Sequence, residues 1–123
     1  DSIEKIIAQI KNVNCRVGLA INPDTEVNEI QKYLPDLDEV TVMTVVPGKG
    51  GQKLIQSCLL KVEKLVEIRT KLNLNYLIQI DGGVKKENIQ SVIKSGADIA
   101  VAGTSVFNNE SVEYNMKSLL NSL

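Results

Sequence analysis

Apolar residues follow two alternating patterns along the chain. Short runs rich in branched apolar residues are separated by longer stretches in which apolar residues return every three or four positions. The first pattern is typical of strands buried on both faces, and the second is typical of amphipathic helices. The expected strands are residues 16–21, 40–46, 76–80 and 99–102. A helical stretch follows each of them, and one more helix precedes the first.

The helices are expected from the apolar periodicity. Their apolar positions are Ile3, Ile6, Ile7 and Ile10, then Val27, Ile30 and Leu34, then Ile55, Leu59, Val62 and Val66, then Ile89, Val92 and Ile93, and finally Val112, Met116, Leu119 and Leu123. Asp1 is expected to cap the first helix, with Glu4 at the reciprocal position of a capping box. Pro35 is expected to close the second helix and Gly96 to cap the fourth.

The order of these elements predicts a parallel sheet of four strands covered by helices. An open doubly wound sheet has the same alternation, with its site at a single switch point. Here every strand ends in a turn rich in Gly, Pro, Asn or Asp, and the turns at Gly48, Asp81 and Gly103 have the composition of binding loops. Barrel enzymes place their sites at the ends of several strands. We therefore predict one α/β domain, residues 1–123, that forms the last four βα units of a (β/α)8 TIM barrel.

Composition argues against several classes of function. The 123 residues carry a formal net charge of -1 and 3% aromatic residues, so no surface for nucleic acid is expected. No apolar run approaches the roughly 20 residues that a membrane span requires. Cys15 and Cys58 lie far apart and are expected to be buried thiols of a reducing compartment, which favours a cytoplasmic protein.

The chain contains no histidine. Because most general bases, catalytic triads and zinc sites use histidine, catalysis must rely on carboxylates, Lys, Tyr or a metal bound elsewhere. The charged residues of the third helix are expected to form a solvated face with local charge pairing. They are Lys61, Glu63, Lys64, Glu67 and Arg69.

The first candidate for chemistry is the turn Pro47-Gly48-Lys49-Gly50-Gly51-Gln52. Its glycines allow positive φ and close backbone approach, and successive N–H groups before a helix N-terminus can form an anion-binding nest. The GxxxxGK[ST] spacing of a P-loop is absent. A flexible connector explains the glycines equally well, and Lys49 is either a solvated side chain or a contact to the anion.

Two further turns are candidates. In Asp81-Gly82-Gly83 a carboxylate follows a buried strand, so Asp81 could act as a general acid/base or bind a metal, although an ordinary Asx turn has the same residues. Gly103-Thr104-Ser105 suits phosphate binding by backbone N–H groups, and barrel enzymes often hold phosphate after their last two strands. A helix-capping Thr or Ser is the alternative. Met43 is assigned to the core or to the floor of a pocket.

Several strings of the sequence resemble the ribulose-5-phosphate 3-epimerase family. They are residues 17–23, 42–48, 50–53, 80–84, 96–98 and 101–107. The resemblance covers nearly the whole chain. The string Met43-Thr44-Val45-Val46-Pro47-Gly48, followed by Gly50-Gly51-Gln52, is specific to this family and its close sugar-phosphate epimerase relatives.

The resemblance implies an isomerase of the pentose phosphate pathway that interconverts D-ribulose 5-phosphate and D-xylulose 5-phosphate. In the family two aspartates on opposite faces of the substrate exchange the C3 proton, and a divalent metal (Zn, Fe, Mn or Co) stabilises the enediolate. Asp81 matches the aspartate that is both acid/base and metal ligand, and Met43 matches a methionine of the pocket. Lys49, a further candidate binding residue, stands where the family usually has an aromatic residue. The positions around the substrate, several of them phosphate donors, match Gly48, Gly50, Gly51, Gly82, Gly83, Gly103 and Thr104.

The family's other aspartate and its two metal-binding histidines lie in the first four βα units, which have no counterpart here. We therefore expect part of a longer epimerase, with an incomplete metal site and no substantial activity alone. A homo-oligomer is expected, because half a barrel leaves two strand edges unpaired. The alternatives are a noncatalytic sugar-phosphate or anion-binding half barrel, and an allulose-6-phosphate 3-epimerase, whose family shares these strings.

Overall fold

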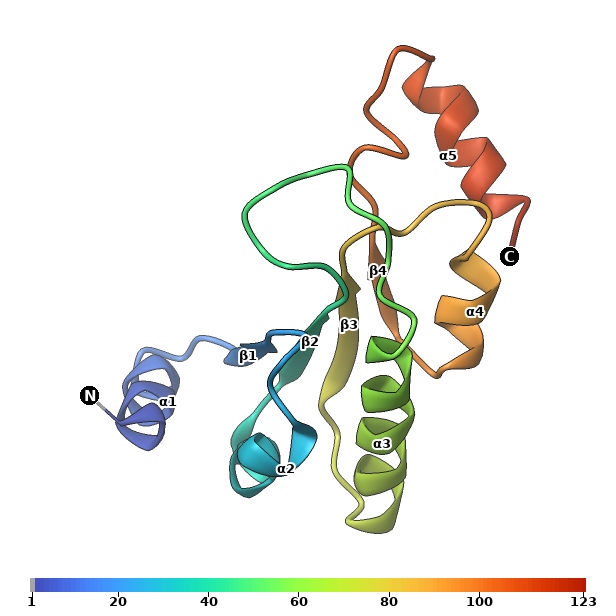
Figure 1. Cartoon of the computed structure of the whole chain (residues 1–123). Helices are drawn as coiled ribbons and strands as arrows, with labels where there is room; N and C mark the ends of the chain where they lie inside the picture. The colour runs from blue at the N-terminus through green and yellow to red at the C-terminus, as the bar shows by residue number, and fades with distance from the viewer. Residues whose placement is uncertain (1) are drawn as a thin grey trace.

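The computed structural model describes residues 2–123 and contains a parallel sheet whose strands alternate with helices (Figure 1). The strands are β1 (Gly18–Ile21), β2 (Glu39–Met43), β3 (Leu77–Asp81) and β4 (Ile99–Val101). The helices are α1 (Ile3–Asn12), α2 (Val27–Ile30), α3 (Cys58–Lys71), α4 (Ile89–Lys94) and α5 (Val112–Leu120), and the short 3-10 helix η1 (Gln31–Asp36) follows α2. The predicted succession of strands and helices is confirmed.

Strands that are neighbours in the chain are also neighbours in the sheet. The spatial order is β1-β2-β3-β4, and every pairing is parallel. A doubly wound sheet reverses its direction of growth at the switch point, whereas a barrel adds each strand on the same side. The observed order contains no reversal. The chain therefore has the architecture of four consecutive βα units, half of a (β/α)8 barrel.

The two faces of the sheet differ in polarity. Val40 and Val42 of β2 are fully buried and pair in register with Ile78 and Ile80 of β3, so this face belongs to the apolar core beneath the helices. The intervening residues of both strands are only half-buried and are mostly polar. Because successive side chains of a strand point to opposite faces, these residues line the face that a closed barrel turns inward.

Several element ends differ from the prediction. Asp1 lies outside the described residues, and the N-cap of α1 is Ser2, whose Oγ accepts a hydrogen bond from the Lys5 N–H. Pro35 does not close a helix but lies inside η1, while α2 has already ended at Ile30. The prediction for Gly96 is confirmed, since its φ of +94° follows the last residues of α4 and its N–H donates to the Ile93 carbonyl.

The expected solvated face of α3 is wrong for two of its residues. Lys61 is buried, and its Nζ donates to the carbonyls of Pro23 and Thr25 at 2.6 Å and of Asn22 at 3.3 Å. Arg69 pairs with the Asp98 carboxylate at 2.6 Å and donates to the Tyr76 carbonyl at 2.9 Å. The physical reason is position: residues 61, 65 and 69 share one face of a helix, and Leu65 between them is fully buried.

The two cysteines lie in different environments. Cys58 is buried as expected, and burial raises the pKa of its thiol, so it stays protonated at neutral pH. Cys15 is exposed, so the expectation of a buried thiol is wrong there. It follows the turn formed by Val13 and Asn14 at the end of α1, in which Asn14 has a positive φ. In residues 2–123, no helix has both the length and the apolar character needed to cross a membrane.

Lys61→Met tests the contribution of the buried ammonium group. The variant keeps the apolar stem but removes the hydrogen bonds to the three carbonyls, so we expect the free energy of unfolding to fall by about 1.5–3 kcal/mol. Lys64→Met, on the same helix, is the control because Lys64 donates a single hydrogen bond, to Asn28, in an exposed position. Urea unfolding followed by circular dichroism measures both. Equal losses would contradict a special role for Lys61.

Candidate functional site

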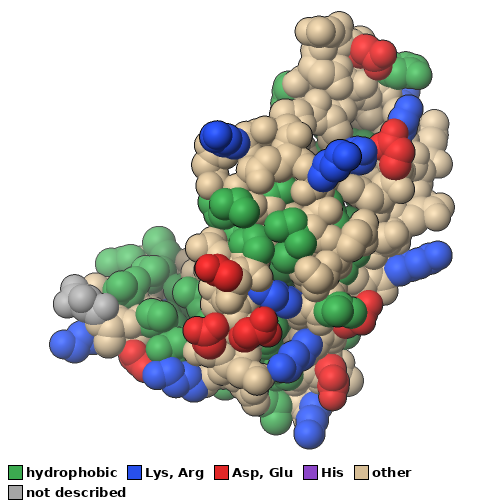
Figure 2. Space-filling model, in the orientation of Figure 1, with side chains coloured by type: hydrophobic (Ala, Val, Ile, Leu, Met, Phe, Trp, Pro, Cys, Tyr) green, Lys and Arg blue, Asp and Glu red, His purple; other side chains and the backbone are tan. Residues whose placement is uncertain are grey.

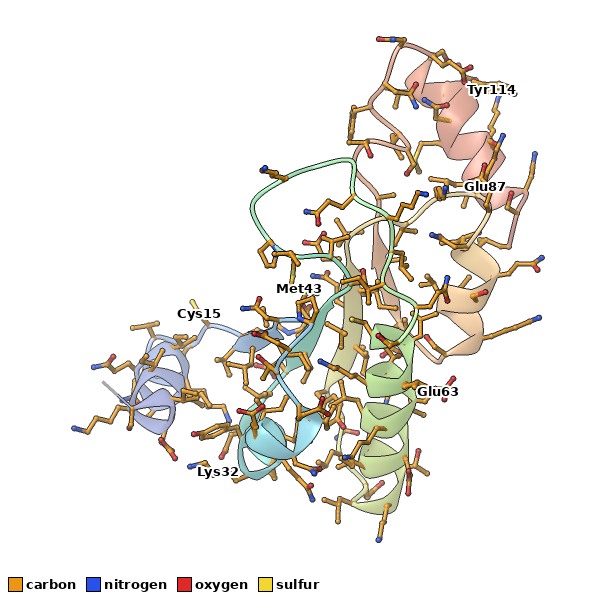
Figure 3. All side chains as sticks on the ribbon, in the orientation of Figure 1. Cys15, Lys32, Met43, Glu63, Glu87 and Tyr114 are labelled. Carbon is orange, nitrogen blue, oxygen red and sulfur yellow. The ribbon has the colours of Figure 1, made fainter. Side chains whose placement is uncertain are left out.

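All the residues that the sequence singled out line one open cavity of about 650 Å³ at the C-terminal ends of β2, β3 and β4. They are Met43, Gly48, Lys49, Gly50, Gly51, Asp81, Gly82, Gly83, Gly103 and Thr104. Figure 3 shows Met43 at the end of β2, where the strand enters the long loop that leads to α3. Met43 is half-buried, so it belongs to the floor of the cavity and not to the closed core.

Asp81 is positioned by the residue that follows β2. The Thr44 N–H donates to the Asp81 carbonyl at 3.0 Å, and the Thr44 hydroxyl donates to the Gly82 carbonyl at 2.6 Å. Thr44 is fully buried, and Asp81 pairs in register with Met43. These contacts hold the backbone at Asp81 and directly after it, and Asp81 lies half-buried on the cavity wall.

The two glycines after Asp81 allow the loop between β2 and α3 to pack closely against this turn. Gly82 has φ +131°, and a Cβ there would overlap the side chain of Val45. Gly83 has φ +70°, and a Cβ there would overlap the Leu54 backbone and lie 2.9 Å from the Gln52 carbonyl oxygen. The far end of the glycine-rich loop therefore rests directly on the Asp81-Gly82-Gly83 turn, and only glycine fits at this contact.

Gln52 stabilises the glycine-rich loop from within. Its Nε2 donates to the Val46 carbonyl at 2.6 Å and to the Lys49 carbonyl at 2.8 Å, so one side chain joins the start and the tip of the loop. Gly48 (φ +115°) and Gly51 (φ +74°) supply the turns that this closure requires. Sequence reasoning quoted Gln52 and Thr44 only as letters of a motif. Thr44 directly follows the strand and Gln52 directly follows the glycines, and these positions were the available signal.

The turn Gly103-Thr104-Ser105 lies beside the glycine-rich loop. A Cβ on Gly50 would meet the Thr104 methyl group at 3.6 Å, which is ordinary van der Waals distance. Ser105 does not face a ligand as a free hydroxyl, because its Oγ donates to the Val84 carbonyl at 2.7 Å. This bond joins the turn after β4 to the one after β3. All three turns are therefore connected around the cavity.

Several backbone donors of these turns have no protein partner. Within residues 2–123 no hydrogen bond to protein uses the N–H groups of Gly48, Gly50, Gly51, Gly83, Gly103 and Thr104. Unpaired N–H groups that converge on a concave surface are typical of anion sites. The expected support from a helix N-terminus is wrong for the glycine-rich loop, because α3 begins only at Cys58. Any anion there is held by loop N–H groups.

The cavity does not contain a complete metal site. Across the part of the chain that the structure describes, no cluster of three or more Cys, Asp or Glu residues is placed to hold a metal ion. Asp81 is the one acidic residue that lines the cavity, and a catalytic metal usually takes three protein ligands. A divalent metal therefore does not fit the residues present here unless other ligands are added.

The parallel βα units, with their glycine-rich turns gathered at the C-terminal ends of the strands, define half of a (β/α)8 barrel. The model of the ribulose-phosphate 3 epimerase family matches residues 1–107, so the chain belongs to that family.

Named relatives agree with this assignment. Ribulose-phosphate 3-epimerases from Aquifex aeolicus, Schizosaccharomyces pombe and Bacillus subtilis are 35%, 39% and 41% identical over 117, 120 and 106 residues. The matches cover 95%, 98% and 85% of this chain, but 53%, 51% and 49% of those proteins. The chain thus spans about half the length of the curated relatives it matches.

A solved structure supports the fold independently. The crystal structure of a 3-hexulose-6-phosphate synthase superimposes on the chain with a TM-score of 0.69 at 20% identity. The match covers 96% of this chain and 54% of that one. At this identity the likeness concerns the architecture, and it agrees with a half barrel.

Gly51→Ala and Gly83→Ala separate backbone strain from crowding, because the two glycines have nearly the same φ. A Cβ at Gly51 meets nothing within 4 Å, whereas at Gly83 it overlaps the Leu54 backbone. We expect Gly51→Ala to cost about 1–2 kcal/mol of stability, the usual penalty of left-handed backbone, and Gly83→Ala to cost clearly more. Urea unfolding measures both variants. Equal costs would show that the two loops are not packed together.

Proposed function

We propose that this chain is the phosphate-binding half of a ribulose-phosphate 3-epimerase, which interconverts D-ribulose 5-phosphate and D-xylulose 5-phosphate. The observation that carries the proposal is that glycine-rich turns with unpaired N–H groups and a single carboxylate, Asp81, line one cavity in a member of this family. We propose further that this epimerase acts in the pentose phosphate pathway and in the cytoplasm.

In the proposed reaction the chain performs two tasks. The N–H groups of Gly48, Gly50, Gly51, Gly83 and their neighbours after β4 bind the phosphate and fix the sugar above the floor of the cavity. Asp81, at the end of β3, then takes the proton from C3 on one face or returns it on that face. Thr44 keeps the Asp81 backbone in place during this exchange.

Inversion at C3 also requires a group on the opposite face of the sugar. Asp81 cannot supply both groups, because one carboxylate faces the substrate from one side only. The second acid/base, and the ligands that complete a metal site around Asp81, are proposed to come from residues outside this chain. The metal would polarise the oxygens next to C3 and so acidify the C3 proton.

The purified 123-residue chain tests this division of tasks. We expect Asp81→Asn to change the affinity for methyl phosphate by less than about twofold, because the phosphate donors are backbone groups of other residues. Calorimetry measures the affinity, and a coupled assay measures epimerase turnover, which we expect at background for both proteins. If the wild-type chain showed epimerase turnover and Asp81→Asn abolished it, the chain would supply its own opposing group. That result would contradict the proposal that this group comes from outside the chain.

A noncatalytic anion-binding module is the second candidate, and the presence of one carboxylate in the cavity favours it. Titration with D-ribulose 5-phosphate separates the two functions. An epimerase half binds the sugar phosphate more tightly than methyl phosphate, and the difference shrinks in Asp81→Asn. A plain anion module binds both equally. D-Allulose 6-phosphate in the same titration distinguishes a five-carbon from a six-carbon substrate.

We further propose that two copies of the chain associate through the free edges of the sheet. β1 and β4 each pair with a single neighbour and carry no charged residue or Pro that would protect an edge. Large apolar side chains are exposed beside them, including Phe107 and Leu120, around an apolar groove between β4, α4 and α5. Figure 1 shows α5 beyond the C-terminal end of β4, and Figure 2 shows hydrophobic side chains open to solvent over the middle of the face and along α1.

Light scattering tests this association. We expect a dimeric mass for the chain, whose monomer is 13.5 kDa, and a shift toward the monomer for Ala20→Lys, which places a charge on the exposed edge strand β1. Ser91→Lys, on the exposed surface of α4, is the control and is expected to leave the mass unchanged. A monomeric mass for the wild type at micromolar concentration would contradict the proposal.

A further inference from the structure

The wall of the cavity carries an excess of positive charge that the backbone anion site does not explain. Three lysines, Lys49, Lys53 and Lys85, line the cavity, and we name them the cationic rim. Asp81 is the one acidic residue lining it, so three lysines and one carboxylate contribute charge to the lining. The chain as a whole has a net charge of -1, so the excess at the cavity is local and does not follow from composition.

The ammonium groups of the rim are not used by the protein. In residues 2–123 the Nζ atoms of Lys49, Lys53 and Lys85 take part in no ion pair or hydrogen bond. Five other lysines do have such partners. All three rim lysines are exposed, so no burial penalty opposes their charge.

The backbones that carry these lysines are nevertheless fixed. The Lys49 carbonyl accepts from Gln52, and Lys53 precedes Leu54, whose backbone packs on Gly83. The Lys85 N–H donates to Asn88 Oδ1 at 2.9 Å. Asn88 in turn donates to the Gly83 carbonyl at 2.8 Å. The three lysines are therefore carried by backbone that hydrogen bonds and packing hold in place at the cavity.

We infer that the cationic rim makes this site selective for ligands with a doubly charged phosphate monoester over singly charged anions. The inference rests on the proposed function, since it assigns the charge of the ligand that the backbone N–H groups hold. Backbone N–H groups fix the position of an anion at short range, and the rim adds an attraction that grows in proportion to the ligand's charge. Lys49, Lys53 and Lys85 are thus specificity-determining residues and not catalytic ones.

The test compares two triple variants of the 123-residue chain with the same change in net charge. The rim variant is Lys49→Met, Lys53→Met and Lys85→Met. The control is Lys5→Met, Lys71→Met and Lys94→Met, which removes three exposed lysines of α1, α3 and α4 that do not line the cavity. Calorimetry gives the affinities for methyl phosphate, a dianion near pH 7.5, and for dimethyl phosphate, a monoanion. Circular dichroism checks that both triple variants are folded. If the rim variant is not folded, Lys49→Met alone takes its place.

We expect the rim variant to bind methyl phosphate about tenfold more weakly and dimethyl phosphate about threefold more weakly, because each exposed charge contributes modestly and the loss scales with ligand charge. The control should change both by less than about twofold. In the wild type, affinity for methyl phosphate should also fall with added salt more steeply than in the rim variant. Equal affinities of the rim and control variants would overturn the inference while leaving the anion site intact. Failure of the wild type to bind methyl phosphate would instead overturn the proposed function.

Discussion

The site depends on the hydrogen bonds of one buried residue, Thr44. Its N–H donates to the Asp81 carbonyl, its hydroxyl to the Gly82 carbonyl, and its own carbonyl accepts from the Ile55 N–H at 2.8 Å. The end of β2, the turn after β3 and the segment leading into α3 are thereby joined at a single point. Because Thr44 is fully buried, water cannot replace these partners, and the geometry around Asp81 is set by the core.

The proposed anion donors have no protein partner, and side chains hold the turns that carry them. Gln52 closes the glycine-rich loop on two carbonyls, and Asn88 and Ser105 each bind a carbonyl of the turn after β3. Each of these bonds uses a side-chain donor and a backbone acceptor. The loop N–H groups are therefore left without partners at the surface of the cavity, which is the electrostatic requirement for binding an anion.

The sequence predicted the order of elements and the residues of the cavity, because glycine and aspartate at strand ends carry a local signal. It could not predict how Thr44 and Gly82 meet, since 38 residues separate them and no periodicity links them. The prediction that Lys61 is solvated is wrong for a related reason. Its charge suggested solvent, but it lies one turn before Leu65, on the helix face that packs against the protein. The prediction that Pro35 ends a helix is wrong because the 3-10 helix η1 accommodates this proline.

The polarity of the sheet bears on the proposed association of two copies of the chain. On the inward face, Gln79 donates to the Thr41 hydroxyl at 3.1 Å, and that hydroxyl lies 3.3 Å from the Glu39 carboxylate. This polar row tolerates water, so the inward face of the sheet does not need an apolar cover. The unpaired strand edges and the apolar groove beside α5 do not tolerate water in the same way. The proposed association would therefore be driven at the edges of the sheet, where closure of a barrel would also complete the wall opposite Asp81.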